Sequence, residues 1–336
     1  MGKVCLSLLL VCGLCSAALA QPYTILVLKG GGIRGIAYTG AIEVLEERHV
    51  LQGIQNVAGT SAGAIAATLI SVGYTAGEMK ELMFGMKVQA FNDGRWFFIG
   101  GQKRLRKNYG WYRGEALARW VGKALQQKTG HADLTFMQLH QLAQTDSRYK
   151  DLYVTATNLS LQRAEVFSWR TYPHMAIKTA VRASAAIPLY YSAVLLDSAG
   201  NIVRRPSRTG HYQVLVDGGI LENYPIAIFD TGNVPNPHTL GLNLQRPEQI
   251  AYGDTTGGLA PYNISTFSSY IAAFYNIIIE NLNKANSKVH DRSRTIYIST
   301  DNMSPRVRGM SLEQKTKLYS NGRVAAAAFL EQNSKQ

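Results

Sequence analysis

The feature that most constrains this chain is the pentapeptide Gly-Thr-Ser-Ala-Gly at residues 59–63. An apolar run from Ile54 to Ala58 precedes it, and an alanine-rich apolar stretch that favours helix follows it. A G-x-S-x-G sequence at a strand-to-helix turn holds its serine on a strained bend with the hydroxyl exposed. The helix N-terminus then places N–H groups and a partial positive charge beneath the serine oxygen. The pattern predicts a nucleophile elbow made of Gly59, Thr60, Ser61, Ala62 and Gly63.

A glycine-rich loop marks a second strand-to-helix turn upstream. The apolar run Tyr23–Leu28 predicts a buried strand, and Gly-Gly-Gly-Ile-Arg-Gly follows at 30–35. The loop fits the dinucleotide fingerprint, which also requires an acidic residue about twenty positions further on. No carboxylate occurs from Val50 to Ser61, so we expect no cofactor. The alternative use of such a loop is to turn backbone N–H groups toward a developing oxyanion.

A candidate base for the serine comes much later in the chain. Asp217 ends an apolar strand predicted at Tyr212–Val216, the position where open α/β sheets place their ligands. Gly218 and Gly219 follow and leave space for a ligand to approach. A carboxylate is a weak base for a hydroxyl unless its surroundings raise its basicity. None of the seven histidines has the setting of a triad histidine, and His290 is the best candidate for the alternative, a histidine-dependent serine esterase.

The amino-terminal segment reads as a secretory signal peptide. A basic residue, a short apolar run and Ala-Leu-Ala at 18–20 match its three regions, and the run is too short to span a membrane. We expect a signal peptide at 1–20, cleavage before Gln21, and a secreted or periplasmic destination. All three cysteines lie in this segment, so the rest of the chain has no disulfides to stabilise it. Residues 21–336 suffice for one large domain with its own core.

The positive charge and the aromatic content of the chain favour binding to a polyanionic partner. The formal net charge of +13 favours attraction to nucleic acid or to acidic lipid. Residues 91–112 interleave basic with aromatic side chains, and their glycines predict a loop. That mixture suits lipid headgroups, single-stranded nucleic acid, or a loop whose rings pack back onto the body. Because of the chemistry suggested by Ser61, we favour peripheral contact with an anionic membrane and expect no nucleic acid.

Predicted strands and helices alternate along the chain, which indicates a layered α/β domain around a largely parallel sheet. A hairpin is expected from the two strands at 152–157 and 164–169. Further strands are predicted at 190–196, 239–244 and 295–299, and helices at 75–88, 113–128, 134–143, 175–184, 265–282 and 311–330.

Four blocks of the sequence, taken in order, resemble the signature sequences of the patatin-like phospholipases. They are the 30–35 loop, the 59–63 pentad, Ala-Ser-Ala-Ala-Ile-Pro at 183–188, and Asp-Gly-Gly at 217–219 with the Asn and Pro that follow. The resemblance covers nearly the whole chain from residue 23 onward. It implies the three-layer patatin-like α/β fold, with a mostly parallel central sheet flanked by helices.

The resemblance also implies an activity. It is that of a lipid acyl hydrolase of the phospholipase A or lysophospholipase type, which uses a Ser–Asp dyad without histidine or metal. Ser61 is then the nucleophile, Asp217 the base, and a phospholipid or other acyl lipid the substrate. A non-catalytic lipid-binding protein with the same fold is a further alternative. The oxyanion hole implied by the resemblance comprises Gly30, Gly31, Gly32, Ile33, Arg34 and Gly35.

Overall fold

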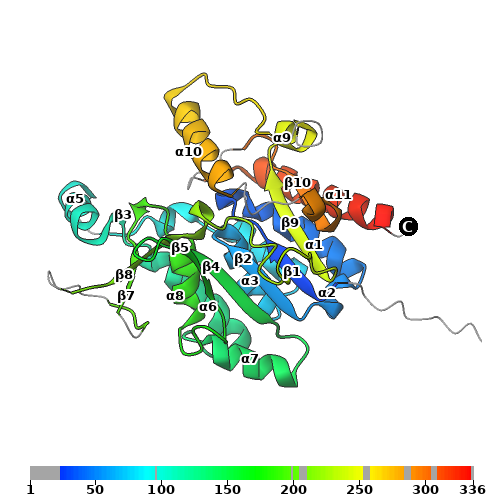
Figure 1. Cartoon of the computed structure of the whole chain (residues 1–336), viewed down its shortest axis with the longest axis horizontal. Coiled ribbons are helices and arrows are strands. Elements are labelled where there is room, and N and C mark those ends of the chain that lie inside the picture. Colours follow the sequence, from blue (N-terminus) through cyan, green and yellow to red (C-terminus); the bar gives the residue numbers. More distant parts are fainter. Residues whose placement is uncertain are drawn as a thin grey trace, which may run out of the picture.

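A sheet of mainly parallel strands forms the centre of the computed structural model (Figure 1). The strand order is β10-β9-β1-β2-β4-β8-β7, and β5 also pairs with β4. The strands from β10 to β4 are parallel to their neighbours, whereas β5, β7 and β8 pair antiparallel. These strands are β1 (Ile25–Leu28), β2 (Asn56–Thr60), β4 (Asp151–Asn158), β5 (Arg163–Phe167), β7 (Val194–Leu196), β8 (Gln213–Asp217), β9 (Thr239–Gln245) and β10 (Thr295–Ser299). The structure describes residues 23–94, 97–197, 200–203, 210–252, 258–283, 289–303 and 309–333, so the predicted signal peptide lies outside the described residues.

Helices connect the strands and flank the sheet, as expected for this class of fold. The α-helices are α1 (Ala37–Glu47), α2 (Val50–Gly53), α3 (Ala62–Ser71), α4 (Ala76–Gly85), α5 (Phe97–Asn108), α6 (Glu115–Thr129), α7 (Phe136–Thr145), α8 (Ile177–Ser184), α9 (Pro247–Tyr252), α10 (Phe267–Asn283) and α11 (Leu312–Asn333). Short 3-10 helices are η1 (Gly32–Ile36), η2 (Val88–Phe91), η3 (Gly218–Ile220) and η5 (Val289–Arg294). Within the described part of the chain, no helix combines the length and hydropathy needed to cross a bilayer.

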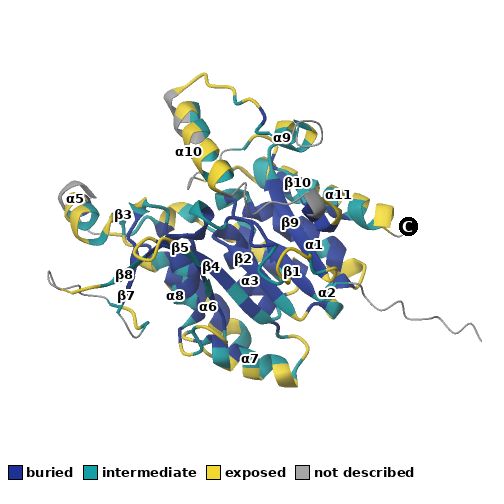
Figure 2. Ribbon diagram, in the orientation of Figure 1, coloured by how far each residue is buried: buried dark blue, intermediate teal, exposed yellow. Residues whose placement is uncertain are grey.

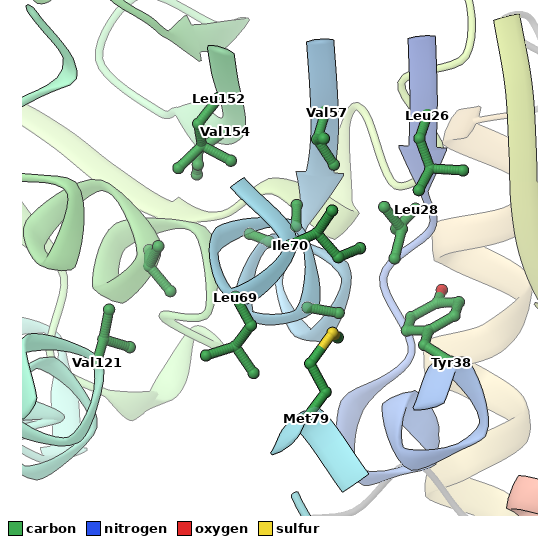
Figure 3. Packing of buried hydrophobic residues seen from close by; sticks show 14 of the residues in the cluster. Leu26, Leu28, Tyr38, Val57, Leu69, Ile70, Met79, Val121, Leu152 and Val154 are labelled. Carbon is green, nitrogen blue, oxygen red and sulfur yellow. The ribbon is translucent and has the colours of Figure 1, made fainter. Parts of the chain in front are cut away.

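Strand β1 shows how the sequence builds the layers. Alternate side chains of a strand face opposite sides of the sheet. Leu26 and Leu28 join the main core, where they pack with Val57 of β2 and with α1 and α3 (Figure 3). Ile25 and Val27 join a second cluster on the other face, which the segment 224–229 covers. Both faces of β1 are therefore buried, which explains its continuous apolar sequence.

Strands β2 and β8 reach the same strand, β4, from opposite directions. Strand β2 runs parallel to β4, and its last residue, Thr60, pairs with Thr155. Strand β8 runs antiparallel to β4, and its last residue, Asp217, pairs with Ala156, the next residue of β4. The C-terminal ends of β2 and β8 therefore meet at consecutive positions of one strand.

The region 91–112 is not the loop that its glycines led us to expect. It contains α5 and the strand β3 (Gly110–Tyr112), which pairs with β6 (Leu189–Tyr191). A Cβ on Gly101 would lie 2.6 Å from the Trp111 ring. The expectation was wrong because glycine serves close packing here rather than a turn. The strand predicted at 190–196 is likewise divided between β6 and β7.

Candidate active site

Ser61 occupies the turn between β2 and α3 in a strained conformation. Its φ of 52° and ψ of −116° lie in a region that residues other than glycine rarely adopt. A Cβ on Gly59 would lie 2.4 Å from the carbonyl carbon of Gly63, and a Cβ on Gly63 would lie 2.3 Å from Leu28 O. Strand and helix thus approach too closely for a side chain at either glycine. Ala62 begins α3, and the Thr60 hydroxyl donates to Glu222 O at 2.8 Å.

The structure brings Ser61 and Asp217 together. Ser61 Oγ donates a hydrogen bond to Asp217 Oδ2 at 3.0 Å, although 156 positions separate the residues in the chain. Both residues are buried, with Ser61 exposing 9% and Asp217 exposing 7% of their surface. The second carboxylate oxygen, Oδ1, accepts a hydrogen bond from Gly219 N at 2.7 Å. The carboxylate is therefore fixed with one oxygen aimed at the serine hydroxyl.

Burial makes the Asp217 carboxylate more basic. Loss of solvation raises the pKa of Asp217 to about 6, although the hydrogen bonds from Gly219 and Ser61 act to lower it. Burial also raises the pKa of the neighbouring Glu222 carboxyl to about 7. At neutral pH Asp217 is thus mainly ionised, yet it holds a proton more readily than an exposed aspartate does. This is the property that a general base for a hydroxyl requires.

The segment 183–188 connects the two residues through its side chains and backbone. Ser61 N donates to Ser184 Oγ at 2.7 Å, which anchors the strained turn. Asp217 N donates to Ala186 O at 2.9 Å, which fixes the end of β8. The sequence marked this segment only as a block of a resembling family and assigned no role to Ser184. A buried hydroxyl beside small residues carries no signal of its own, so the role emerges only from the fold.

The glycine loop lies beside Ser61 and opens into η1. Gly32 has a φ of 57°, which favours glycine, and Gly31 precedes the helix. The first N–H groups of a helix have no partner within it, and these belong to Gly32, Ile33 and Arg34. Gly30 N, in contrast, donates to Asn223 O at 2.8 Å. This bond removes Gly30 from the expected set of oxyanion donors and makes it a residue that positions the loop.

Two cationic side chains near the glycine loop, Arg34 and Lys29, contact the loop backbone and α10 respectively. Arg34 Nε donates to Gly31 O at 3.0 Å, so its side chain supports the loop from within. Burial lowers the pKa of Arg34, whereas the Glu280 carboxylate raises it. The buried Lys29 forms an ion pair with the same Glu280 at 3.0 Å. These contacts attach α10 to the start of the glycine loop, a link that the sequence did not predict.

An apolar pocket opens at Ser61. The loop residues Gly32 and Ile33 line it together with Ser61, and so do side chains from α3, α4, η2 and α6. Its remaining lining is almost wholly apolar and includes Ile36, Ile65, Met83, Met86, Phe91, Leu117, Ile187 and Tyr191. A larger depression of about 680 Å³ is lined by Ile33 and by mostly polar residues of 301–303 and 310–317, and neither Ser61 nor Asp217 borders it.

Comparison with known proteins agrees with this geometry. The sequence pattern of the patatin-like phospholipase family matches residues 26–230. The chain belongs to that family. An uncharacterised protein of Acanthamoeba polyphaga mimivirus is 27% identical over 300 residues, covering 88% of this chain and 90% of its own. A probable lipid hydrolase of Invertebrate iridescent virus 6 is 25% identical over 61% of this chain and 63% of its own.

The fold of this patatin-like protein also resembles that of a solved structure. VipD from Legionella pneumophila superposes with a TM-score of 0.58 at 18% identity, over 93% of this chain and 67% of that one. At that identity the likeness concerns the fold alone. Membership of the patatin-like phospholipase family places the protein among the ester hydrolases.

The serine of this patatin-like site is paired with an aspartate. Among the described residues, none of the histidines hydrogen-bonds to Ser61 or Asp217. A His–Asp pair does occur, with His140 Nδ1 2.9 Å from Asp151 Oδ1. It lies at the opposite end of the sheet from Ser61, because Asp151 pairs with Asn56 at the start of β2. Within the same described residues, no group of three His, Cys, Asp or Glu side chains is arranged to bind a metal ion.

Proposed function

We propose that the protein hydrolyses carboxylic esters of phospholipids or other acyl lipids through a Ser61–Asp217 dyad. The observation that carries this proposal is the 3.0 Å hydrogen bond from Ser61 Oγ to a buried carboxylate, at the mouth of an apolar pocket. A hydroxyl becomes a nucleophile when an adjacent base takes its proton, and here the adjacent base is Asp217.

Acylation begins when Asp217 accepts the Ser61 proton as Oγ attacks the ester carbonyl carbon. The carbonyl oxygen becomes an oxyanion, which the N–H groups of Gly31, Gly32 and Ile33 stabilise in this proposal. Each such donor is worth about 3 kcal/mol in the transition state. The C–O bond to the alcohol then breaks, and the departing oxygen takes the proton from Asp217. An acyl group remains on Ser61.

Deacylation repeats these steps with water. Asp217 accepts a proton from water, whose oxygen attacks the acyl-serine carbonyl carbon. The bond to Ser61 Oγ breaks, Oγ recovers the proton from Asp217, and the fatty acid leaves. The α3 N-terminus lies beneath Ser61 and stabilises negative charge at both stages.

The apolar pocket supplies the reason for a lipid substrate. Its lining offers an acyl chain a surface of methionine, isoleucine and aromatic side chains beginning at Ser61 itself. Methionine is unbranched and flexible, so it adapts to chains of different shape. We place the acyl chain in this pocket and the alcohol part of the ester on the side of the glycine loop facing solvent.

We also propose that the protein is exported and acts at an anionic membrane surface. The amino-terminal segment supports export, and the net charge of +13 supports attraction to acidic lipid. Mass spectrometry of the exported protein should find Gln21 at its amino terminus. An intact Met1 would contradict export by a cleaved signal peptide.

A fluorophosphonate probe tests the dyad directly. The wild-type protein should bind the probe covalently, Ser61→Ala should lose it, and Asp217→Asn should label far more slowly. The exposed Ser147 provides a matched control, because Ser147→Ala should label normally. Mass spectrometry of the products from defined phospholipids then identifies the bond that is cleaved.

Three results would contradict the proposal in different ways. Absence of labelling in the wild type would favour a lipid-binding protein without catalysis. Retained ester hydrolysis in Asp217→Asn would reject the aspartate as base. Loss of activity on replacement of one histidine would favour a triad. The double variant Ser61→Ala with Asp217→Asn should lose no more activity than either single variant, because the two residues act as a unit.

A further inference from the structure

Helix α10 exposes several large apolar side chains along one face. Its large side chains Tyr270, Phe274, Ile277, Ile278 and Leu282 are each exposed by 40% to 55%. At 100° per residue these five positions fall within less than half of the helix circumference. Figures 1 and 2 show α10 standing out from the sheet, with exposed residues along its length. A grouped apolar face of this kind marks a contact with another molecule or a membrane.

The opposite side of α10 is attached to the active site. Glu280 points away from the apolar face and forms the 3.0 Å ion pair with Lys29, which precedes the glycine loop. The helix also packs against η3, which directly follows Asp217. Helix α10 thus contacts the short helix that follows the base and the residue that precedes the glycine loop.

The charges of α10 suit an acidic lipid surface. Glu280 is the only charged residue of its sequence, and Lys29 neutralises it. Two lysines, Lys284 and Lys288, follow the helix in the chain. A neutral apolar face on a protein with a net charge of +13 meets no repulsion from acidic headgroups and can bury its side chains among them.

We propose that the exposed face of α10 is the surface by which the protein docks on an anionic phospholipid bilayer. The proposal rests on the lipid hydrolase function above, because a lipid ester must leave the bilayer to reach Ser61. Docking through α10 places the membrane next to η3 and the glycine loop. The cationic helix α5, with exposed Lys103, Arg106 and Lys107, is the competing surface that the sequence favoured.

Vesicle sedimentation in a Ser61→Ala background tests the docking without any turnover. The probes are vesicles of phosphatidylcholine alone and of phosphatidylcholine mixed equally with phosphatidylglycerol. Substituting Phe274→Ser and Ile277→Ser together should weaken binding to the mixed vesicles about tenfold or more. The matched control is Leu312→Ser with Val324→Ser on α11, which are 71% and 66% exposed and should bind normally. Phe274→Trp should shift its emission to the blue when mixed vesicles are added.

The possible outcomes separate this inference from the function on which it rests. Normal binding by the α10 variant, or an equal loss in the α11 control, would overturn docking through α10. Loss of binding only when Lys103, Arg106 and Lys107 are changed to Gln would assign docking to α5 instead. Concentration-dependent dimers that the α10 substitutions abolish would assign the face to a second copy of the chain. Hydrolysis of a soluble ester, measured with Ser61 intact, should persist in the α10 variant, and its absence in every form would instead reject the proposed function.

Discussion

Replacing the candidate base should make the protein more stable at neutral pH. Asp217 has its pKa raised from 3.8 to about 6 by burial, so the folded chain binds this proton more tightly than the unfolded chain does. Between these two values the folded state holds more protons, and the free energy of unfolding therefore falls as pH rises. The stabilising contribution is complete below 3.8 and is lost above about 6. The difference between a pKa of 3.8 and one of about 6 corresponds to about 3 kcal/mol of unfolding free energy.

Asparagine at 217 removes this titration while it keeps the contacts. Its side-chain oxygen can accept from Gly219 N, and its amide can donate to Ser61 Oγ, in place of the bonds at 2.7 Å and 3.0 Å. The unfolding free energy of Asp217→Asn minus that of wild type should therefore increase by up to about 3 kcal/mol between pH 4 and pH 8. Comparing the two proteins at each pH cancels the titration of all other groups, including Glu222.

Urea unfolding at a series of pH values, followed by circular dichroism, measures this difference. Asp146→Asn is a control of opposite sign, because hydrogen bonds from Arg148 lower the pKa of that partly exposed carboxyl. Its difference from wild type should not increase with pH. A flat or falling difference for Asp217→Asn would refute the reasoning, since it would mean that the fold does not disfavour the charged carboxylate.

Three further predictions follow from the same site. The kcat/KM for a soluble ester should rise as the pH passes through about 6, because Asp217 must be ionised to accept the proton. A kcat/KM that stays constant from pH 5 to pH 7 would contradict this. Ser184→Ala should lower the free energy of unfolding by about 1–3 kcal/mol, because it leaves the buried Ser61 N–H without its acceptor. It should also lower kcat. An unchanged unfolding transition in calorimetry would exclude that role for Ser184. Gly63→Ala should destabilise the fold by about 3 kcal/mol or more, because the new Cβ would lie 2.3 Å from Leu28 O. In the same urea assay Gly77→Ala should stabilise the fold by about 0.5–1 kcal/mol, because a Cβ there meets nothing within 4 Å.

Local patterns in the sequence predicted most of the elements. The pentad gave the strand, turn and helix around Ser61, and the apolar run Tyr23–Leu28 gave β1. These predictions depend on side-chain periodicity and on the steric needs of glycine, which act over a few residues. The hairpin of β4 and β5 followed for the same reason, since both strands are close in the chain.

Features that depend on distant contacts were beyond local patterns. The antiparallel approach of β8, the anchoring of Ser61 by Ser184, and the link between Lys29 and Glu280 join residues more than 50 positions apart. The helix at 265–282 was predicted, but its apolar face reads like any core-facing stripe. Only the fold shows that this stripe remains exposed.

Strands β2 and β8 flank β4 and end beside neighbouring residues of it, so β4 fixes the separation of the reacting pair. Thr155 pairs with Thr60, the residue before Ser61, and Ala156 pairs with Asp217. Because Thr155 and Ala156 are neighbours in the chain, they set the separation of Ser61 and Asp217. Outside β4 and the segment 183–188, the residues that connect nucleophile and carboxylate do not set that separation. Insertions, deletions or grafted loops there could remodel substrate choice while the spacing of the reacting atoms stays the same.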